Sequence, residues 1–279
     1  MKDKKQPMTD LALALAKKDE ESAAAASKVN TLSARQMILA ILDDSTFAET
    51  GTYVRRSADS DEFEGVICGY GAIDSRLVFI FAQDFFRMKG AFDRQQAKKI
   101  CDLYALAEKS GAPVIGINDS GGARIQEGVN SLSGYTEIFQ RNILASGVIP
   151  QISAIFGPCA GGAVYSPALT DFILMNQGTS YMFVTGPKVV KTVTGEEVSQ
   201  EQLGGASVHA AKSGVAHFVS ENEEEGIATL RKLLGFLPSN NMEDAPAVDC
   251  TDAIDRLDDV LNDIIPDNPN KPYNVLDVI

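Results

Sequence analysis

The chain has 279 residues, a formal net charge of −13 and four scattered cysteines, Cys68, Cys101, Cys159 and Cys250. Much of the acidity lies near the C-terminal end, where the residues from Glu243 onward hold ten acidic and two basic side chains. A chain this acidic lacks the clustered Lys and Arg that nucleic acids and anionic membranes require, so we expect neither as a partner. Cysteines without a Cys-x-x-Cys pair argue against a zinc ribbon and are typical of a reducing compartment.

The N-terminal sequence is charged, and its apolar stretch is too short for the core of a secretory signal. It opens with Met1-Lys2-Asp3-Lys4-Lys5, and the apolar stretch at 11–16 is shorter than the roughly 7–15 residues of a signal-peptide core. No run in the sequence approaches the roughly 20 apolar residues of a membrane span. We therefore expect a cytoplasmic protein with no direct membrane insertion.

The first third of the chain predicts two helices followed by a hairpin. Residues 9–27 are alanine-rich, and we interpret them as a helix in a peripheral arm. Ser33 can cap a second helix, whose apolar residues recur at spacings of three and four. Two β-rich runs, 66–73 and 77–81, then flank a short polar turn and indicate a β-hairpin.

From residue 92 onward the sequence alternates between helical and strand patterns. Helical periodicity begins at Phe92 and ends at a glycine stop, Gly111. The later elements are strands at 113–118, 149–156, 172–175 and 181–184, and helices at 132–144, from Pro187, at 222–234 and, with acidic character, at 251–264. This alternation is typical of layered α/β domains. We predict one main domain over residues 30–237, a helical arm at 1–29, and an acidic helix with a proline-rich, linker-like tail at 238–279.

Two glycine-rich bends are the most informative feature of the sequence. The first bend is Ser120-Gly121-Gly122-Ala123-Arg124, and the second is Gly157-Pro158-Cys159-Ala160-Gly161-Gly162-Ala163. Each follows a short apolar run that reads as a buried strand, and each leads into a helical stretch. Bare backbone N–H groups in such bends suit a negative oxygen that forms during a reaction. A lone Gly-Gly pair is more often a tight turn, but two bends after successive strands favour an oxyanion-stabilising site.

Other side chains offer weaker candidates. Ser120 lacks the Gly-x-Ser-x-Gly frame of a nucleophile, and neither bend ends in the Gly-Lys-Ser/Thr of a phosphate loop. His209 and His217 have no carboxylate at ligand spacing, so we expect structural hydrogen bonds and no metal site. Glu127 and Glu137 could serve as the acid or base of a hydratase, although solvated helix carboxylates are commoner.

A basic cluster lies between the predicted hairpin and the helix that follows it. It consists of Arg87, Lys89, Arg94, Lys98 and Lys99. These side chains could meet the phosphates of an anionic substrate, which an acidic protein must attract locally. A simply solvated face explains the cluster equally well.

The bends and their flanks resemble one family, the carboxyltransferase (beta) component of biotin-dependent acyl-CoA carboxylases, of the propionyl-CoA carboxylase and methylmalonyl-CoA carboxyltransferase type. The matching stretches are residues 117–128, 157–171, 182–187 with 191–196, and 213–217. The resemblance runs from about residue 30 to the C-terminus and covers the N-terminal one of the two domains that family members usually carry. It implies a crotonase-like (ClpP/crotonase) spiral of ββα units with an N-terminal helical extension.

The resemblance also implies the chemistry and its residues. The α-carbon of a CoA thioester becomes an enolate and takes the carboxyl group from carboxybiotin, or the reaction runs in reverse, and no protein base is obligatory. The oxyanion site would be formed by backbone N–H groups around Gly121, Gly122, Ala123, Gly161 and Gly162. Coenzyme A would contact Arg87, Lys89, Gly90, Ala91, Arg94 and Ala160. One departure is that the family usually shows a Gly-Gly-Ala/Ser-Leu-Gly-Glu segment where this chain has Lys89-Gly90-Ala91-Phe92-Asp93-Arg94.

The function expected from the resemblance is the acyl-CoA-binding half of a split carboxyltransferase that acts on propionyl-CoA or acetyl-CoA. Its partners would be a separate C-type carboxyltransferase subunit, without which it is inactive, together with a biotin carboxyl carrier protein and biotin carboxylase, in a trimeric or hexameric ring. Two alternatives stay open: a subunit of a biotin-dependent (methyl)malonyl-CoA decarboxylase, and a non-catalytic assembly subunit whose altered segment at 89–94 has closed the pocket. A crotonase-type hydratase or hydrolase fits the motifs less well.

Overall fold

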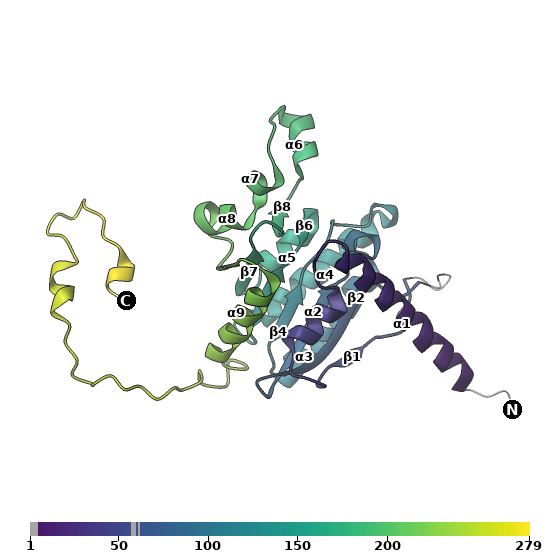
Figure 1. Ribbon diagram of the computed structural model, residues 1–279, viewed down its shortest axis with the longest axis horizontal. Helices are drawn as coiled ribbons and strands as arrows, with labels where there is room; N and C mark the ends of the chain where they lie inside the picture. Colours follow the sequence, from purple (N-terminus) through teal and green to yellow (C-terminus); the bar gives the residue numbers. More distant parts are fainter. Residues whose placement is uncertain (1–4, 57–59, 61) are drawn as a thin grey trace. The chain divides into compact units, whose positions relative to one another are not determined.

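The computed structural model describes residues 5–56, 60 and 62–279 (Figure 1). The chain divides into two compact units, Met1–Pro246 and Ala247–Ile279. Within the described residues, no helix combines the length and the apolar character needed to cross a membrane. The boundaries drawn from the sequence at residues 29 and 237 stay predictions.

Two helices open the first unit, α1 (Lys5–Ser27) and α2 (Ala34–Ile41). Only the first part of α1 fits the interpretation as a peripheral arm, because its last turns are buried. Ser22 is 6% exposed and donates a hydrogen bond to Asp84 at 2.6 Å, and Ala26 is fully buried. Ser33 forms a capping box at the start of α2, which confirms the predicted cap.

A seven-stranded sheet forms the centre of this unit. Its order is β1 (Ala48–Thr50), β2 (Val66–Ile73), β3 (Arg76–Gln83), β4 (Val114–Ile117), β5 (Gln151–Ile155), β7 (Phe172–Asn176) and β9 (Phe218–Ser220). The strands β1, β2 and β3 are antiparallel, and from β3 onward every pair is parallel. The predicted hairpin is confirmed, with Asp74 and Ser75 both at positive φ in the two-residue turn. The carboxyl ends of the parallel strands therefore share one edge of the sheet.

Helices cover both faces of the sheet (Figure 1). On one face, α3 (Arg94–Ser110) packs against α4 (Val129–Ala145) over an apolar core; on the other, α2 lies near α9 (Glu223–Phe236) over a second core. Asp93 caps α3, and Gly111 ends it in the left-handed conformation, as the sequence predicts. The sheet is therefore covered by an apolar core on each face, and the bends lie at its carboxyl edge.

A smaller substructure rises beyond that edge. It comprises β6 (Pro158–Ala160) paired with β8 (Tyr181–Phe183), the 3₁₀ segment η3 (Gly161–Val164), α5 (Tyr165–Ala168), α6 (Pro187–Thr194), α7 (Gln200–Gly204), α8 (Ala206–Val208) and the π-helical turn η4 (His209–Ser213). The second bend thus contains a short strand before its helix begins at Gly161. Two further 3₁₀ segments, η1 (Met88–Gly90) and η2 (Ile125–Glu127), lie in the connections beside the bends.

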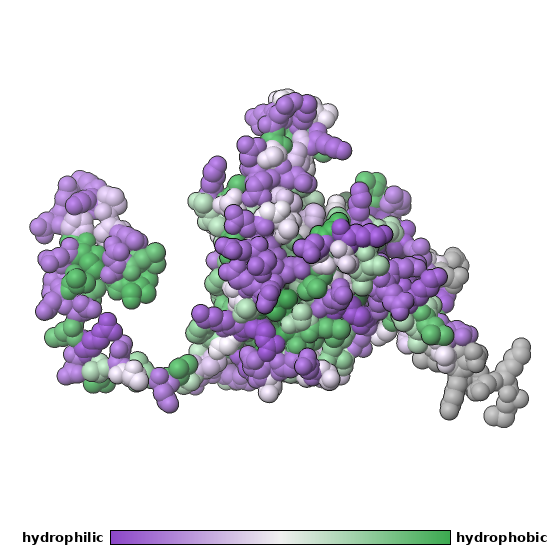
Figure 2. Space-filling view, in the orientation of Figure 1, coloured by the Kyte–Doolittle hydropathy of each residue, from purple (hydrophilic) through white to green (hydrophobic). Residues whose placement is uncertain are grey.

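The acidic helix predicted at 251–264 is wrong. The second unit holds only two 3₁₀ segments, η5 (Asp259–Asp263) and η6 (Val275–Asp277). Its apolar side chains, including Ile254 and Leu257, are largely exposed. Figure 2 shows hydrophobic groups in green on the surface of this unit. An isolated helix of this length is marginal in water without a packing partner, and Asp is a weak helix former.

Candidate active site

The two glycine bends adjoin each other at the carboxyl edge of the sheet. The Ser120 N–H donates to the Pro158 carbonyl at 2.9 Å, and the Ala160 N–H donates to the Ser120 carbonyl at 2.9 Å. At Gly122, the Cβ that glycine lacks would lie 3.9 Å from the Cα of Gly161. The structure therefore brings together two segments that lie about forty residues apart in the sequence.

Close approach explains why these positions need glycine. Gly122 has φ +101°, and a Cβ there would lie 3.0 Å from the Ala160 carbonyl oxygen. Gly161 has φ +63°, a left-handed conformation that side chains rarely adopt. At Gly162 a Cβ would lie 3.0 Å from the ring of Tyr135.

Hydrogen bonds within the bends narrow the set of available donors. The Gly121 N–H donates to the Lys89 carbonyl at 2.8 Å, and the Gly122 N–H donates to Ser120 Oγ at 3.1 Å. These two amides are therefore already engaged. The amides of Gly161 and Gly162 occupy the first positions of η3, where a helix offers them no internal acceptor. The Ala123 N–H takes part in none of the backbone hydrogen bonds found in the described turns and loops.

Ser120 is part of the scaffold of the first bend. Its side chain is fully buried, and its hydroxyl donates to the Gly90 carbonyl at 2.7 Å while accepting from the Gly122 N–H. No base is hydrogen-bonded to it in the part of the chain that the structure describes. The interpretation as a turn hydroxyl fits this geometry, and a nucleophile does not.

The segment at 88–91 closes over the first bend. Met88, Lys89 and Gly90 all have positive φ, and a side chain at Gly90 would collide with the Asp119 carbonyl oxygen. This tight path leaves the Lys89 side chain exposed, with its backbone fixed to Gly121. Lys89 is therefore a cation held beside the bend, while Gly90 and Ala91 contribute backbone there.

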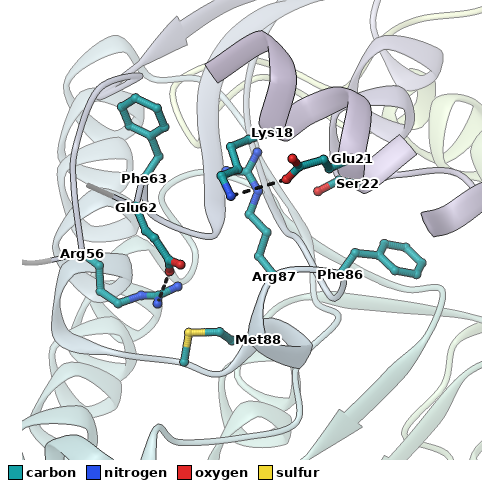
Figure 3. Close-up of a pocket in the computed structure, with 9 residues that line it drawn as sticks. All are labelled: Lys18, Glu21, Ser22, Arg56, Glu62, Phe63, Phe86, Arg87 and Met88. Carbon is teal, nitrogen blue, oxygen red and sulfur yellow. Dashed lines mark hydrogen bonds and ion pairs between the residues drawn. The ribbon is translucent and has the colours of Figure 1, made fainter. Parts of the chain in front are cut away.

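Arg87 already has two acidic partners within the protein. Its guanidinium faces Asp19 at 3.0 Å and Asp84 at 3.1 Å, so it ties α1 to the strand edge. Figure 3 shows Arg87 in a cavity of about 230 Å³ between α1 and the loops that follow β1 and β3. The other cations of this cavity are also paired, Lys18 with Glu21 at 3.4 Å and Arg56 with Glu62 at 2.6 Å. Arg87 is therefore part of an ion-pair network in this structure, and its predicted contact with coenzyme A stays a prediction.

The remaining members of the basic cluster divide in the same way. Lys99 is buried and donates to the Val66 carbonyl at 2.6 Å, and Lys98 pairs with Asp102 at 2.5 Å. Arg94 is well exposed, and its partner is Glu137 at 3.5 Å. Of the basic cluster, then, Lys89, Arg94 and Lys98 are exposed, and both Arg94 and Lys98 have a carboxylate partner on the surface.

Phe92 does not obstruct the bends. It is 1% exposed and stacks on Tyr135, with ring centroids 4.1 Å apart. Its bulk therefore fills the core beneath the second bend. The segment at 89–94 departs from the family pattern in sequence, but its largest apolar side chain points inward.

Arg124 is a basic residue that the sequence reasoning did not single out. It follows the first bend, and its guanidinium lies 3.3 Å from Glu127 and 3.6 Å from Asp93. Its Nε is buried without a hydrogen-bond partner among the described residues. The signal was present, because Arg124 closes the Ser-Gly-Gly-Ala-Arg motif.

Both histidines make structural hydrogen bonds, as expected. His209 Nε2 lies 2.7 Å from the Met182 carbonyl and must donate to it, and His217 Nδ1 accepts from the Ile173 N–H at 3.1 Å. Across the described residues, no group of three His, Cys, Asp or Glu side chains is placed to hold a metal ion.

Comparisons with known proteins bear on this geometry. The carboxyl transferase domain family matches residues 27–279. The methylmalonyl-CoA decarboxylase subunit alpha of Veillonella parvula is 56% identical over 255 residues, which are 89% of this chain and 50% of that protein. The propionyl-CoA carboxylase beta chain of Cereibacter sphaeroides is 52% identical over 259 residues, which are 90% of this chain and 51% of that protein.

A solved structure gives the same result in three dimensions. The crystal structure of transcarboxylase 12S, described as a hexamer assembly with methylmalonyl-coenzyme A and methylmalonic acid bound, is 39% identical with a TM-score of 0.85. The match covers 100% of this chain and 56% of that one. The structural neighbours are carboxyltransferases of the crotonase-like fold, so the predicted fold class is confirmed. This chain spans about half the length of the curated relatives it matches, and it belongs to the carboxyl transferase domain family.

Proposed function

We propose that this chain is the acyl-CoA-binding half of a biotin-dependent carboxyltransferase, acting on a short-chain acyl-CoA such as propionyl-CoA or acetyl-CoA. The observation that carries the proposal is the contact between the two glycine bends, beside the exposed cation of Lys89. Three amides remain as donors for the thioester oxygen, those of Ala123, Gly161 and Gly162. Lys89 and Arg94 supply positive charge for the coenzyme A phosphates, and Ala160 and the backbone of Gly90 and Ala91 line the approach.

The chemistry follows from what fixed amides do for a thioester. When the α-carbon loses its proton, negative charge moves onto the carbonyl oxygen, and preorganised N–H donors stabilise that charge without reorganising. Carboxybiotin, when bound, would supply the carboxyl group and accept the α-proton, while the fixed amides of this chain would hold the thioester oxygen. No side chain of this chain needs to act as the base.

The active carboxyltransferase would also need a second domain of the same family. In support, this chain spans about half the length of its curated relatives, and the transcarboxylase 12S structure is described as a hexamer assembly. We propose a C-type carboxyltransferase subunit as the direct partner, in a trimeric or hexameric ring, with a biotin carboxyl carrier protein and biotin carboxylase supplying carboxybiotin. We further propose a cytoplasmic location.

The test uses the chain with and without a purified second carboxyltransferase domain. Calorimetry measures propionyl-CoA binding, and chromatography follows the release of propionyl-CoA from methylmalonyl-CoA with free biotin as the acceptor. We expect weak binding by the chain alone and turnover only with the added domain. Full turnover by the single chain would refute the need for a partner, and no binding even with the added domain would refute the acyl-CoA site.

A decarboxylase subunit is the second candidate, because the Veillonella parvula relative named above is a methylmalonyl-CoA decarboxylase subunit. The same amides would stabilise the same enolate as the carboxyl group leaves methylmalonyl-CoA. The direction depends on the proteins that consume or supply carboxybiotin. Isolation of the native complex, with subunits identified by mass and a streptavidin blot, separates the two: a biotin carboxylase subunit in the complex supports carboxylation.

Two other readings fit the geometry less well. A hydratase needs free carboxylates, whereas Glu127 pairs with Arg124 and Glu137 pairs with Arg94. An assembly subunit with a closed pocket would need the bulk of Phe92 in the site, and that ring is buried in the core.

A further inference from the structure

Asp119 connects the two glycine bends through its side chain. It lies directly before Ser120, and its Oδ1 accepts a hydrogen bond of 2.7 Å from the N–H of Gly157, the first residue of the second bend. Gly157 has no side chain, and a Cβ there would lie 2.8 Å from Asp119 Oδ1. The carboxylate therefore links the start of the first bend to the start of the second, and the lack of a side chain at Gly157 makes room for it.

The same carboxylate lines a cavity of about 690 Å³ at the carboxyl edge of the sheet. The walls come from the α1–α2 loop, the segments after β3, β4, β5 and β7, and the start of α9, and they include Phe85, Phe156 and Glu224. Asp119 is thus reached from solvent on the cavity side and bonded to the bends on the other.

The surroundings of Asp119 disfavour its charge. Burial raises the pKa of its carboxyl group to about 7, and the acids Glu223 and Asp84 add to the shift, while the bond from Gly157 opposes it. Cys159 also lies close enough to sense the Asp119 charge. A pKa of about 7 lies inside the interval from pH 6 to pH 8.5, so the charge of Asp119 can be varied by pH in the experiment below.

We propose that Asp119 is a positioning residue, which acts through the Gly157 amide to hold the two bends in register. An ionised carboxylate accepts from an N–H more strongly than a neutral acid does, so the register is firmest when Asp119 is charged. The inference rests on the proposed function, because its effect is read from carboxyl transfer. It predicts that turnover, more than substrate binding, depends on Asp119, since the bends carry the donors for the transition state.

The experiment compares four variants with the wild type, each with the second carboxyltransferase domain present. Asp119→Ala removes the acceptor, Gly157→Ala pushes the carboxylate away, and Asp119→Asn keeps an oxygen acceptor that does not titrate. Glu224→Gln is the matched control, because Glu224 is an exposed carboxylate on the same cavity. kcat and KM for methylmalonyl-CoA are measured from pH 6 to pH 8.5.

We expect Asp119→Ala and Gly157→Ala to lower kcat about ten-fold or more with little change in KM, as small misplacements of reacting groups do. The Glu224→Gln variant should match the wild type. The charged carboxylate of Asp119 accepts more strongly from the Gly157 N–H than the neutral acid does. The kcat of the wild type divided by the kcat of Asp119→Asn should therefore fall as the pH drops through about 7.

Two outcomes would overturn the inference. The first is an Asp119→Ala variant whose kcat equals that of the wild type. The second is a ratio of wild-type kcat to Asp119→Asn kcat that does not change with pH, and this ratio can be measured even if the alanine variant does not fold. Failure of the proposed function is distinct, because then the wild type itself shows no transfer with the second domain present.

Discussion

Replacing Gly162 by alanine tests whether the second bend positions a catalytic donor. The added Cβ would lie 3.0, 3.1 and 3.4 Å from three ring atoms of Tyr135. That ring cannot retreat easily, because Phe92 is stacked on it with centroids 4.1 Å apart. The start of η3 must therefore shift by a few tenths of an ångström. Overpacking of this kind costs about 1–3 kcal/mol of unfolding free energy.

The loss of activity is expected in addition to the loss of stability, and it is measured separately. Loss of one oxyanion donor lowers kcat by about 10²–10³-fold in other enzymes, so we expect a fall of about 100-fold for Gly162→Ala. The assay is methylmalonyl-CoA-dependent carboxyl transfer to free biotin, with the second carboxyltransferase domain supplied and released propionyl-CoA quantified by chromatography. The midpoint of urea unfolding, measured on the same samples, reports stability.

Gly147→Ala is the matched control. Gly147 also needs a special backbone, with φ +72°, but no atom lies within 4 Å of an added Cβ, and it precedes β5 at the far edge of the sheet. It should lose about 1–2 kcal/mol of stability from left-handed strain and keep its kcat. If Gly162→Ala destabilises the protein yet keeps kcat within about two-fold, the donor role of this bend is refuted.

Four further predictions follow from individual contacts. Lys89→Gln should raise the dissociation constant for propionyl-CoA about five-fold, as loss of an exposed ion pair does. Arg87→Gln should leave that constant unchanged and lower the melting temperature. Equal effects of the two variants on binding would contradict the proposal that Lys89 meets the coenzyme A phosphates. Ser120→Ala removes two buried hydrogen bonds, and urea titration should show a loss of about 2–3 kcal/mol. A chain that ends at Pro246 should melt at the temperature of the full chain, since the two units are separately compact. Between pH 3.8 and about 7 the folded wild type holds the Asp119 proton more tightly than the unfolded chain does, so its stability should fall as the pH rises. Over the same pH range, the urea midpoint of Asp119→Asn should fall less than that of the wild type.

Local patterns predicted most of the longer helices and strands of the first unit because their signals are short-range, whereas short strands such as β1 and β9 were not predicted. The cap at Ser33, the glycine stop at Gly111 and the hairpin turn at Asp74 each act within a few residues. The helix predicted at 251–264 failed for the opposite reason. Its apolar residues, such as Ile254 and Leu257, stay exposed, and propensity alone does not hold a short acidic helix together.

The sequence predicted only part of the candidate site. The bends were recognisable from glycine content, yet the sequence did not reveal that the amides of Gly121 and Gly122 are already engaged. Arg87 and Lys89 look alike as neighbouring cations, but one is paired inside the body and the other faces solvent. Such differences depend on which acidic side chains the fold brings near each cation. Asp19, the partner of Arg87, lies in α1, which is remote from Arg87 in the sequence.

By itself, the sequence determined most of the longer strands and helices of the first unit, the two glycine bends and the family resemblance, because periodicity, capping and motifs are written in neighbouring residues. The tertiary structure alone decided which amides are free, which cations are neutralised, and that Asp119 reaches Gly157. Those outcomes depend on distances between segments that are remote in the chain, and parallel pairing of β4 with β5 sets these distances.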